Sequence, residues 1–175
     1  MKSVSKRKVK TAAKTAAKAK VKLAAKSKSK TKAKARAKPA LKPFMTNLHD
    51  VPKVGGLAAK DGWVNMQVQF LIDQKTANSD KMLVGWTVLP PGAQHDRHRH
   101  FHCDEFWIVV KGRGVMYTNE GEKPSSEGDV VFTPRGHWHG FKNNSSEDVV
   151  LVWGWSGAGS LAAAGYESVE GGRTH

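Results

Sequence analysis

Residues 91–114, PGAQHDRHRHFHCDEFWIVVKGRG, carry the pattern that decides the fold of this chain. Two histidines lie two residues apart, and a glutamate follows five residues after the second. A second stretch, residues 128–143 with the sequence GDVVFTPRGHWHGFKN, offers a third histidine in a similar setting. Imidazoles and a carboxylate together are common ligands of divalent transition metals. The predicted ligands are His98, His100, Glu105 and His139.

Both stretches lie among short apolar runs with the composition of β-strands. Residues two apart in a strand point to the same face, so His98 and His100 are predicted to point inward together. Residues 101–104 let the chain turn, and Glu105 then returns on the next strand. About eight such runs follow residue 62, most of them separated by turns with Gly or Pro, which predicts an all-β sandwich or barrel. The runs cover residues 63–72, 82–89, the histidine-rich segment, 106–110, 115–118, 129–133, 137–142 and 149–155. Between the runs, residues 121–128 are expected to form a polar loop.

The two stretches resemble the two signature motifs of the cupin superfamily. The first motif is matched by Gly92, His98, His100, Glu105 and Gly112, and the second by Gly128, Pro134, Gly136, His139 and Asn143. The resemblance covers roughly residues 63–157 and implies a small single-domain cupin with a jelly-roll barrel. Cupins include dioxygenases, decarboxylases, isomerases, lyases, sugar-binding domains and storage proteins. The resemblance therefore implies a fold and a metal site without fixing the reaction.

Three imidazoles and one carboxylate leave two positions of an octahedron open for water, oxygen or a substrate. This set suits Fe(II), Mn(II), Ni(II) or Cu(II), with Zn(II) also possible, and one Fe(II) per subunit is the favoured expectation. Glu105 is further expected to act as a transient catalytic base. His137 shares its parity with His139 and is expected to be a second acid–base group, the alternative being an exposed turn histidine.

Three aromatic residues are expected to line the substrate pocket, namely Trp107, Phe141 and Trp86. Trp107 shares the parity of Glu105, Phe141 shares that of His139, and Trp86 lies on the strand before the first motif. Core packing is the alternative role for each of them. An aromatic, mostly apolar lining suits a small aromatic or enol-type substrate better than a phosphosugar, which needs converging Lys or Arg residues.

The positive charge of the chain is concentrated at its N-terminal end. Residues 1–43 hold 17 of the 29 Lys and Arg residues and no acidic residue, whereas residues 44–175 carry 12 basic and 15 acidic groups. This low-complexity Lys- and Ala-rich segment resembles the tails of linker histones, and its composition predicts disorder. It favours sequence-independent contact with nucleic acid or another polyanion. An inert solubility tail and an organelle transit peptide are the alternatives.

The sequence thus predicts a disordered basic tail (1–43), a linker or exchanged arm (44–62), a cupin-type barrel (63–157) and a C-terminal arm (158–175). The last segment is expected to pack on a neighbouring subunit or to fray, and a homodimer would cover the free sheet edges. No apolar run approaches the ~20 residues that a membrane-spanning helix needs. Cys103 is the single cysteine, which fits a reducing cytoplasm, with nucleoid association if the tail binds DNA.

Three functions are compatible with these residues. The favoured one is a metal-dependent dioxygenase acting on a small catechol, enol or hydroxyketone. The second is a non-redox isomerase, lyase or decarboxylase in which the metal serves as a Lewis acid. The third is a binding module that takes a small ligand in the barrel while the tail holds a polyanion.

Overall fold

The computed structural model describes residues 40–55, 62–169 and 172–173. The strands of a first sheet are β1 (Val54–Gly55), β3 (Gln67–Ile72), β4 (Met82–Leu89), β6 (Asp104–Lys111), β9 (Val130–Thr133) and β11 (Val149–Ser156). The strands of a second sheet are β2 (Trp63–Val64), β5 (Gln94–His100), β7 (Arg113–Thr118), β8 (Gly121–Ser126), β10 (His139–Lys142), β12 (Tyr166–Ser168) and β13 (Gly172–Arg173). A 3-10 helix, η1 (Leu48–Asp50), precedes β1, and the α-helix α1 (Leu161–Ala164) follows β11.

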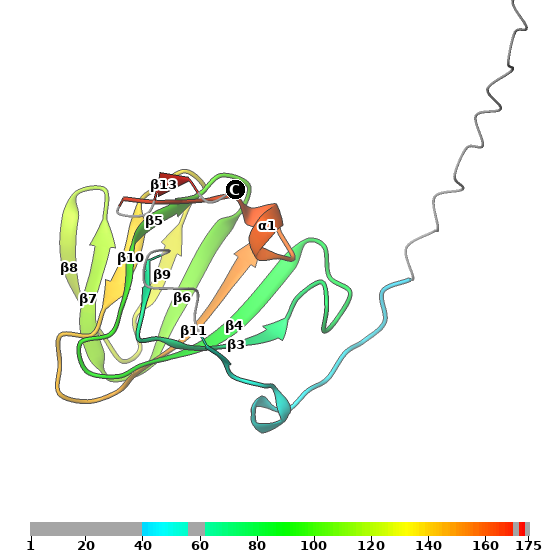
Figure 1. Cartoon of the computed structure of the whole chain (residues 1–175), viewed down its shortest axis with the longest axis horizontal. Helices are drawn as coiled ribbons and strands as arrows, with labels where there is room; N and C mark the ends of the chain where they lie inside the picture. Colours follow the sequence, from blue (N-terminus) through cyan, green and yellow to red (C-terminus); the bar gives the residue numbers. More distant parts are fainter. Residues whose placement is uncertain (1–39, 56–61, 170–171, 174–175) are drawn as a thin grey trace, which may run out of the picture. The chain divides into compact units, whose positions relative to one another are not determined.

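The two sheets face each other and enclose the core (Figure 1). The strand order is β1-β3-β4-β11-β6-β9 in the first sheet and β13-β12-β5-β10-β7-β8 in the second, where β2 also pairs with β5. The pairings between the described strands are antiparallel. This arrangement confirms the predicted all-β jelly-roll barrel.

The interior of the barrel is filled by side chains that alternate along each strand. In β4, Leu83, Thr87 and Leu89 are buried, and the even-numbered residues between them are only half-buried. β6 and β11 pair at the centre of the first sheet, where Trp107 lies opposite Trp153. Because residues two apart share a face of a strand, these strands direct a group of tryptophans inward.

Two strands differ from the sequence-based prediction. Residues 121–126 form β8, which pairs with β7 where a polar loop was expected. The apolar alternation that marks a strand is missing because β8 is an exposed edge strand in which only Ser125 is buried. The run 63–72 is divided into β2 and β3, because Asn65 between them has a φ of 55° that no strand tolerates.

The segments expected to be arms pack on the barrel of their own chain. β1, which falls in the segment 44–62, pairs with β3 at one edge of the first sheet. After β11, the chain forms α1 and then β12, whose Tyr166 lies opposite His100 of β5. Residues 166–168 thus pair with the barrel of this chain, and the expected contact of the C-terminal segment with a neighbouring subunit stays a prediction.

The basic tail falls largely outside the described residues, since the description begins at residue 40. Its predicted disorder therefore stays a prediction. Within the part of the chain that the structure describes, no helix has the length and apolar character that crossing a membrane requires.

Candidate metal centre

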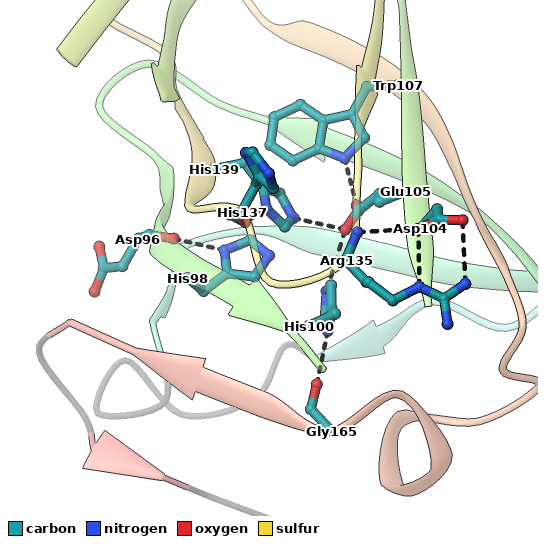
Figure 2. A network of polar contacts seen from close by, with 10 residues as sticks. All are labelled: Asp96, His98, His100, Asp104, Glu105, Trp107, Arg135, His137, His139 and Gly165. Atoms are coloured by element: carbon teal, nitrogen blue, oxygen red, sulfur yellow. Dashed lines mark hydrogen bonds and ion pairs between the residues drawn. The ribbon is translucent and has the colours of Figure 1, made fainter. Parts of the chain in front are cut away.

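The four side chains predicted as metal ligands meet inside the barrel (Figure 2). His98 and His100 come from β5, Glu105 from β6 and His139 from β10. All four are buried, and one ligand atom from each lies within 4.8 Å of the others. His139 is brought beside the other two histidines because β10 pairs with β5 and places it opposite His98.

Each of the three imidazoles is held by a backbone carbonyl. Nδ1 of His98 donates to the carbonyl of Asp96 at 2.7 Å, Nδ1 of His100 to that of Gly165 at 3.0 Å, and Nδ1 of His139 to that of His137 at 3.0 Å. A carbonyl oxygen only accepts hydrogen bonds, so the proton of each neutral ring lies on Nδ1. The lone pair of each ring is then on Nε2, which is the atom a metal would bind.

The Nε2 atoms converge on the carboxylate of Glu105. Oε2 of this residue lies 2.7 Å from Nε2 of His139 and 3.1 Å from Nε2 of His100. With the Nδ1 atoms protonated, these are lone pairs facing an anion, an arrangement that needs a cation at its centre. Nε2 of His98 and Nε2 of His100 are also buried with no hydrogen-bond partner among the described residues. The donor set and its unpaired atoms therefore fit a divalent metal ion.

Glu105 is fixed by a contact that its own strand supplies. The indole N–H of Trp107 donates a hydrogen bond to Oε1, while Oε2 faces the histidines. Burial alone would raise the pKa of this carboxyl, but in the absence of a metal ion a proton on Nε2 of His139 or His100 supplies positive charge and a hydrogen bond to Oε2, and these outweigh burial. The pKa of Glu105 therefore lies well below its usual value, and the group is ionised at neutral pH, as a metal ligand must be. For His98, burial is the main cause of a pKa well below the usual value, which keeps this ring neutral.

The turn between β9 and β10 positions the third histidine. The backbone N–H of Gly136 donates to the carbonyl of His100 at 2.7 Å, and Gly136 has a φ of 81°, which only glycine adopts without strain. Arg135 clamps the same turn to the start of β6 through its backbone N–H and its guanidinium, which both bind the carboxylate of Asp104 (Figure 2). The turn is therefore tied to both ligand strands before it delivers His139.

The side chain of His137 lies away from the ligands. It is exposed, and its Nδ1 lies 3.0 Å from Nδ2 of Asn119. Its carbonyl, in contrast, orients the ring of His139. This placement agrees with the alternative of an exposed turn histidine, so His137 reaches the centre through its backbone.

A small cavity adjoins the predicted ligands, with a volume of about 20 Å³. Its wall includes His100 and Glu105, and four tryptophans contribute to it: Trp63, Trp107, Trp153 and Trp155. Met66, Leu89, Leu151, Leu161 and Tyr166 add to an apolar lining, and none of the described lining residues is Lys or Arg.

Of the three residues predicted for the pocket wall, only Trp107 lines this cavity. Phe141 is buried in the core behind it, with its ring centroid 6.0 Å from that of Trp107. Trp86 points to the opposite face of the first sheet, because its neighbour Thr87 takes the inward position. The parity along β4 therefore places Trp86 outside the pocket, which corrects the prediction.

His95 is a member of the site that the spacing of the motif did not reveal. It lines the cavity and stacks on His98 with ring centroids 3.8 Å apart. By simple alternation these two residues would lie on opposite faces, but the pairing of β5 with β10 shifts register between His139 and Phe141. Such a bulge inserts one residue and turns His95 to the same side. Burial lowers the pKa of His95 to about 3, so its ring is neutral.

Leu161 lies between the inner cavity and a groove on the outside of the barrel. The groove has a volume of about 520 Å³ and is lined by parts of residues 51–54, 70–76 and 160–162 together with Leu83. Leu161 lines both the groove and the inner cavity. It belongs to the four-residue helix α1.

Part of this chain is similar in sequence to known proteins. Residues 85–155 match the family model described as a cupin domain. A gentisate 1,2-dioxygenase from Ralstonia sp is 36% identical over 80 residues, which are 45% of this chain and 22% of that protein. A 1-hydroxy-2-naphthoate 1,2-dioxygenase from Nocardioides sp. (strain KP7) is 31% identical over 86 residues, which are 48% of this chain and 22% of that protein. The chain therefore spans about a fifth of the length of these two relatives.

Solved structures agree on the fold. A protein from Thermotoga maritima described as a predicted oxalate decarboxylase superposes with a TM-score of 0.59 at 21% identity, over 65% of this chain and 99% of that one. A polyketide cyclase from Streptomyces resistomycificus gives a TM-score of 0.57 at 17% identity, over 66% of this chain and 80% of that one. Residues 85–155 thus match a cupin domain, and the solved structures agree with its fold.

Proposed function

We propose that this protein is a divalent-metal-dependent cupin enzyme, and that it acts as a dioxygenase on a small catechol, enol or hydroxyketone. One observation carries the proposal: three buried imidazoles, each fixed with its lone pair on Nε2, converge on an ionised carboxylate beside a tryptophan-lined cavity. The similarity to two dioxygenases supports the choice of reaction.

In this proposal His98, His100, Glu105 and His139 hold the ion, for which Fe(II) is favoured. A divalent ion held there would act as a Lewis acid on the oxygens of a substrate and, if redox-active, would allow chemistry with dioxygen. Glu105 has a second proposed role as a base, since its carboxylate is ionised and lines the cavity. Trp107 keeps that carboxylate in place through its indole N–H.

The lining of the cavity restricts the substrate. No described lining residue is Lys or Arg, which disfavours a phosphate ester, and four indoles favour a small, flat, largely apolar molecule. A cavity of about 20 Å³ holds little more than one water molecule. Substrate binding therefore requires side chains to move, and the proposed point of access is Leu161, which lines both the cavity and the outer groove.

Oxygen consumption tests the proposal. Iron(II)-loaded protein is expected to consume oxygen in the presence of at least one member of a panel of catechols, enols and hydroxyketones, and His139→Ala protein is expected to consume none. Turnover of the same panel under strict anaerobiosis, with manganese, nickel or zinc in place of iron, would instead assign the protein to the isomerase, lyase or decarboxylase class. Absence of oxygen consumption across the panel by fully iron-loaded protein would refute the dioxygenase assignment.

Three further features are proposed on the sequence alone. The charge of residues 1–43 supports sequence-independent contact with nucleic acid or another polyanion, which a gel-shift of full-length and tail-deleted protein tests. Equal affinity of the two proteins for DNA would refute this contact. A homodimer and a cytoplasmic location complete the proposal, and sedimentation analysis checks the first of them.

A further inference from the structure

The four tryptophans of the cavity wall differ in what their indole N–H groups bind. The N–H of Trp107 donates to Oε1 of Glu105, and that of Trp153 donates to Oγ1 of Thr87 at 2.8 Å. These two donors are therefore satisfied within the protein.

The N–H groups of Trp63 and Trp155 have no such acceptor. Both Nε1 atoms are buried, and neither has a hydrogen-bond partner among residues 40–55, 62–169 and 172–173. The two side chains are themselves only 5% and 3% exposed, yet both line the cavity. An unpaired buried N–H of this kind costs about 1–3 kcal/mol, so a fold that retains two of them beside one cavity indicates that a bound molecule satisfies them.

The two N–H groups define what that molecule must present. An indole N–H only donates, so its partner must be an acceptor, and a metal ion bound by the histidines cannot be that partner. The ring of His100 is tilted against the ring of Trp155, with their centroids 4.6 Å apart. Trp63 packs edge-on against His95, with centroids 5.2 Å apart. Each donor thus belongs to a side chain that packs against a histidine of the site.

We infer that Trp63 and Trp155 recognise the oxygen atoms of a small organic oxyanion, a carboxylate or a catecholate, bound at the metal centre. The inference rests on the proposed metal site and adds the substrate class. The ion would supply the positive charge that the lining lacks, and the two neutral donors would select ligands with acceptor oxygens at their positions. Nε2 of His95, also buried without a described partner, is a third polar atom in the same wall.

Nuclear magnetic resonance of the intact protein tests the inference without any catalytic turnover. Zinc-loaded, ¹⁵N-labelled protein is titrated with oxalate as the carboxylate probe and with catechol as the catecholate probe. The indole N–H resonances of Trp63 and Trp155 are expected to move downfield with one or both probes, while those of Trp107 and Trp153 stay nearly unchanged. The probe that moves them identifies which of the two oxyanions the site takes.

Variants that remove the N–H and keep a ring supply the second measurement. Calorimetric titration of zinc-loaded Trp63→Phe and Trp155→Phe is expected to show about 10- to 100-fold weaker binding of the effective probe. Trp86→Phe is the matched control, because Trp86 points to the opposite face of the first sheet and does not line the cavity, and its affinity for the probe is expected to stay unchanged.

The two proposals fail in different ways. Protein that takes up zinc normally but shows no selective shift of the Trp63 and Trp155 resonances with either probe would overturn this inference alone. An equal loss of affinity in Trp86→Phe would overturn it as well. Protein that takes up no zinc would overturn the metal centre, and the inference with it.

Discussion

The hydrogen bond from Trp107 to Glu105 is the contact whose removal most sharply probes the centre. Trp107→Phe deletes the indole N–H and keeps an aromatic ring against Phe141. Oε1 of Glu105 then loses its hydrogen-bond donor, and Glu105 is only 4% exposed. Oε2 keeps its contacts with His100 and His139. The carboxylate remains present but is no longer fixed in orientation.

The size of the effect follows from the charge of the acceptor. A hydrogen bond to a charged group contributes about 1.5–3 kcal/mol, and every 1.4 kcal/mol is a factor of ten in an equilibrium constant. Loss of a residue that orients a metal ligand typically weakens metal binding by about 10- to 100-fold. Both arguments predict that Trp107→Phe weakens the affinity for zinc or iron by about 10- to 100-fold.

Competition with a chromophoric chelator measures this affinity directly. Trp153→Phe is the control for metal affinity. It removes an indole N–H from the same cavity wall, but this N–H binds Thr87 and touches no metal ligand. Circular dichroism verifies that both variants are folded. Equal metal affinity in Trp107→Phe and the wild-type protein would refute the role given to this indole.

Three further predictions concern stability and reactivity. In Gly85→Ala, the new methyl group would overlap the ring of Trp153, so urea unfolding should show a loss of about 1–3 kcal/mol, and an unchanged midpoint would contradict the packing described. Burial raises the pKa of Cys103 to about 12, so Ellman's reagent should leave the folded protein unmodified at about pH 8 and react fully after denaturation. A fast reaction of the folded protein would show that this thiol is accessible. In metal-free protein, burial lowers the pKa of His95 to about 3 and that of His98 well below its usual value. Below about pH 6.5 the unfolded chain therefore binds more protons at these two histidines than the folded protein does. The free energy of unfolding should therefore be retained above that pH and fall as the pH drops below it, and urea titrations that show no such fall would contradict the neutral, buried state of these rings.

Much of this molecule could be predicted from its sequence because the motifs encode strand geometry. The spacing of His98 and His100 reflects the two-residue repeat of a strand, and Glu105 and His139 occupy positions at which the following strands return inward. The strand Met82–Leu89 was predicted with its observed bounds, since it carries apolar residues between clear turn signals.

What the sequence could not indicate depends on contacts between distant segments. The bulge that turns His95 inward arises from the register between β5 and β10, which no local pattern reveals. Gly165, whose carbonyl holds His100, is 65 residues away along the chain. Edge strand β8 has too few buried side chains to show an alternation, and Trp86 was misplaced because its apolar neighbours conceal which parity faces inward.

Metal content is the most direct test of the central claim, which is that the converging imidazoles and Glu105 form a divalent metal site. Inductively coupled plasma mass spectrometry is applied to the purified protein and to the His139→Ala variant, before and after incubation with divalent metals. The account predicts close to one ion per chain in the wild-type protein and a large loss in the variant. A wild-type protein that contains no metal and takes none up, or a variant that retains the full amount, would contradict it.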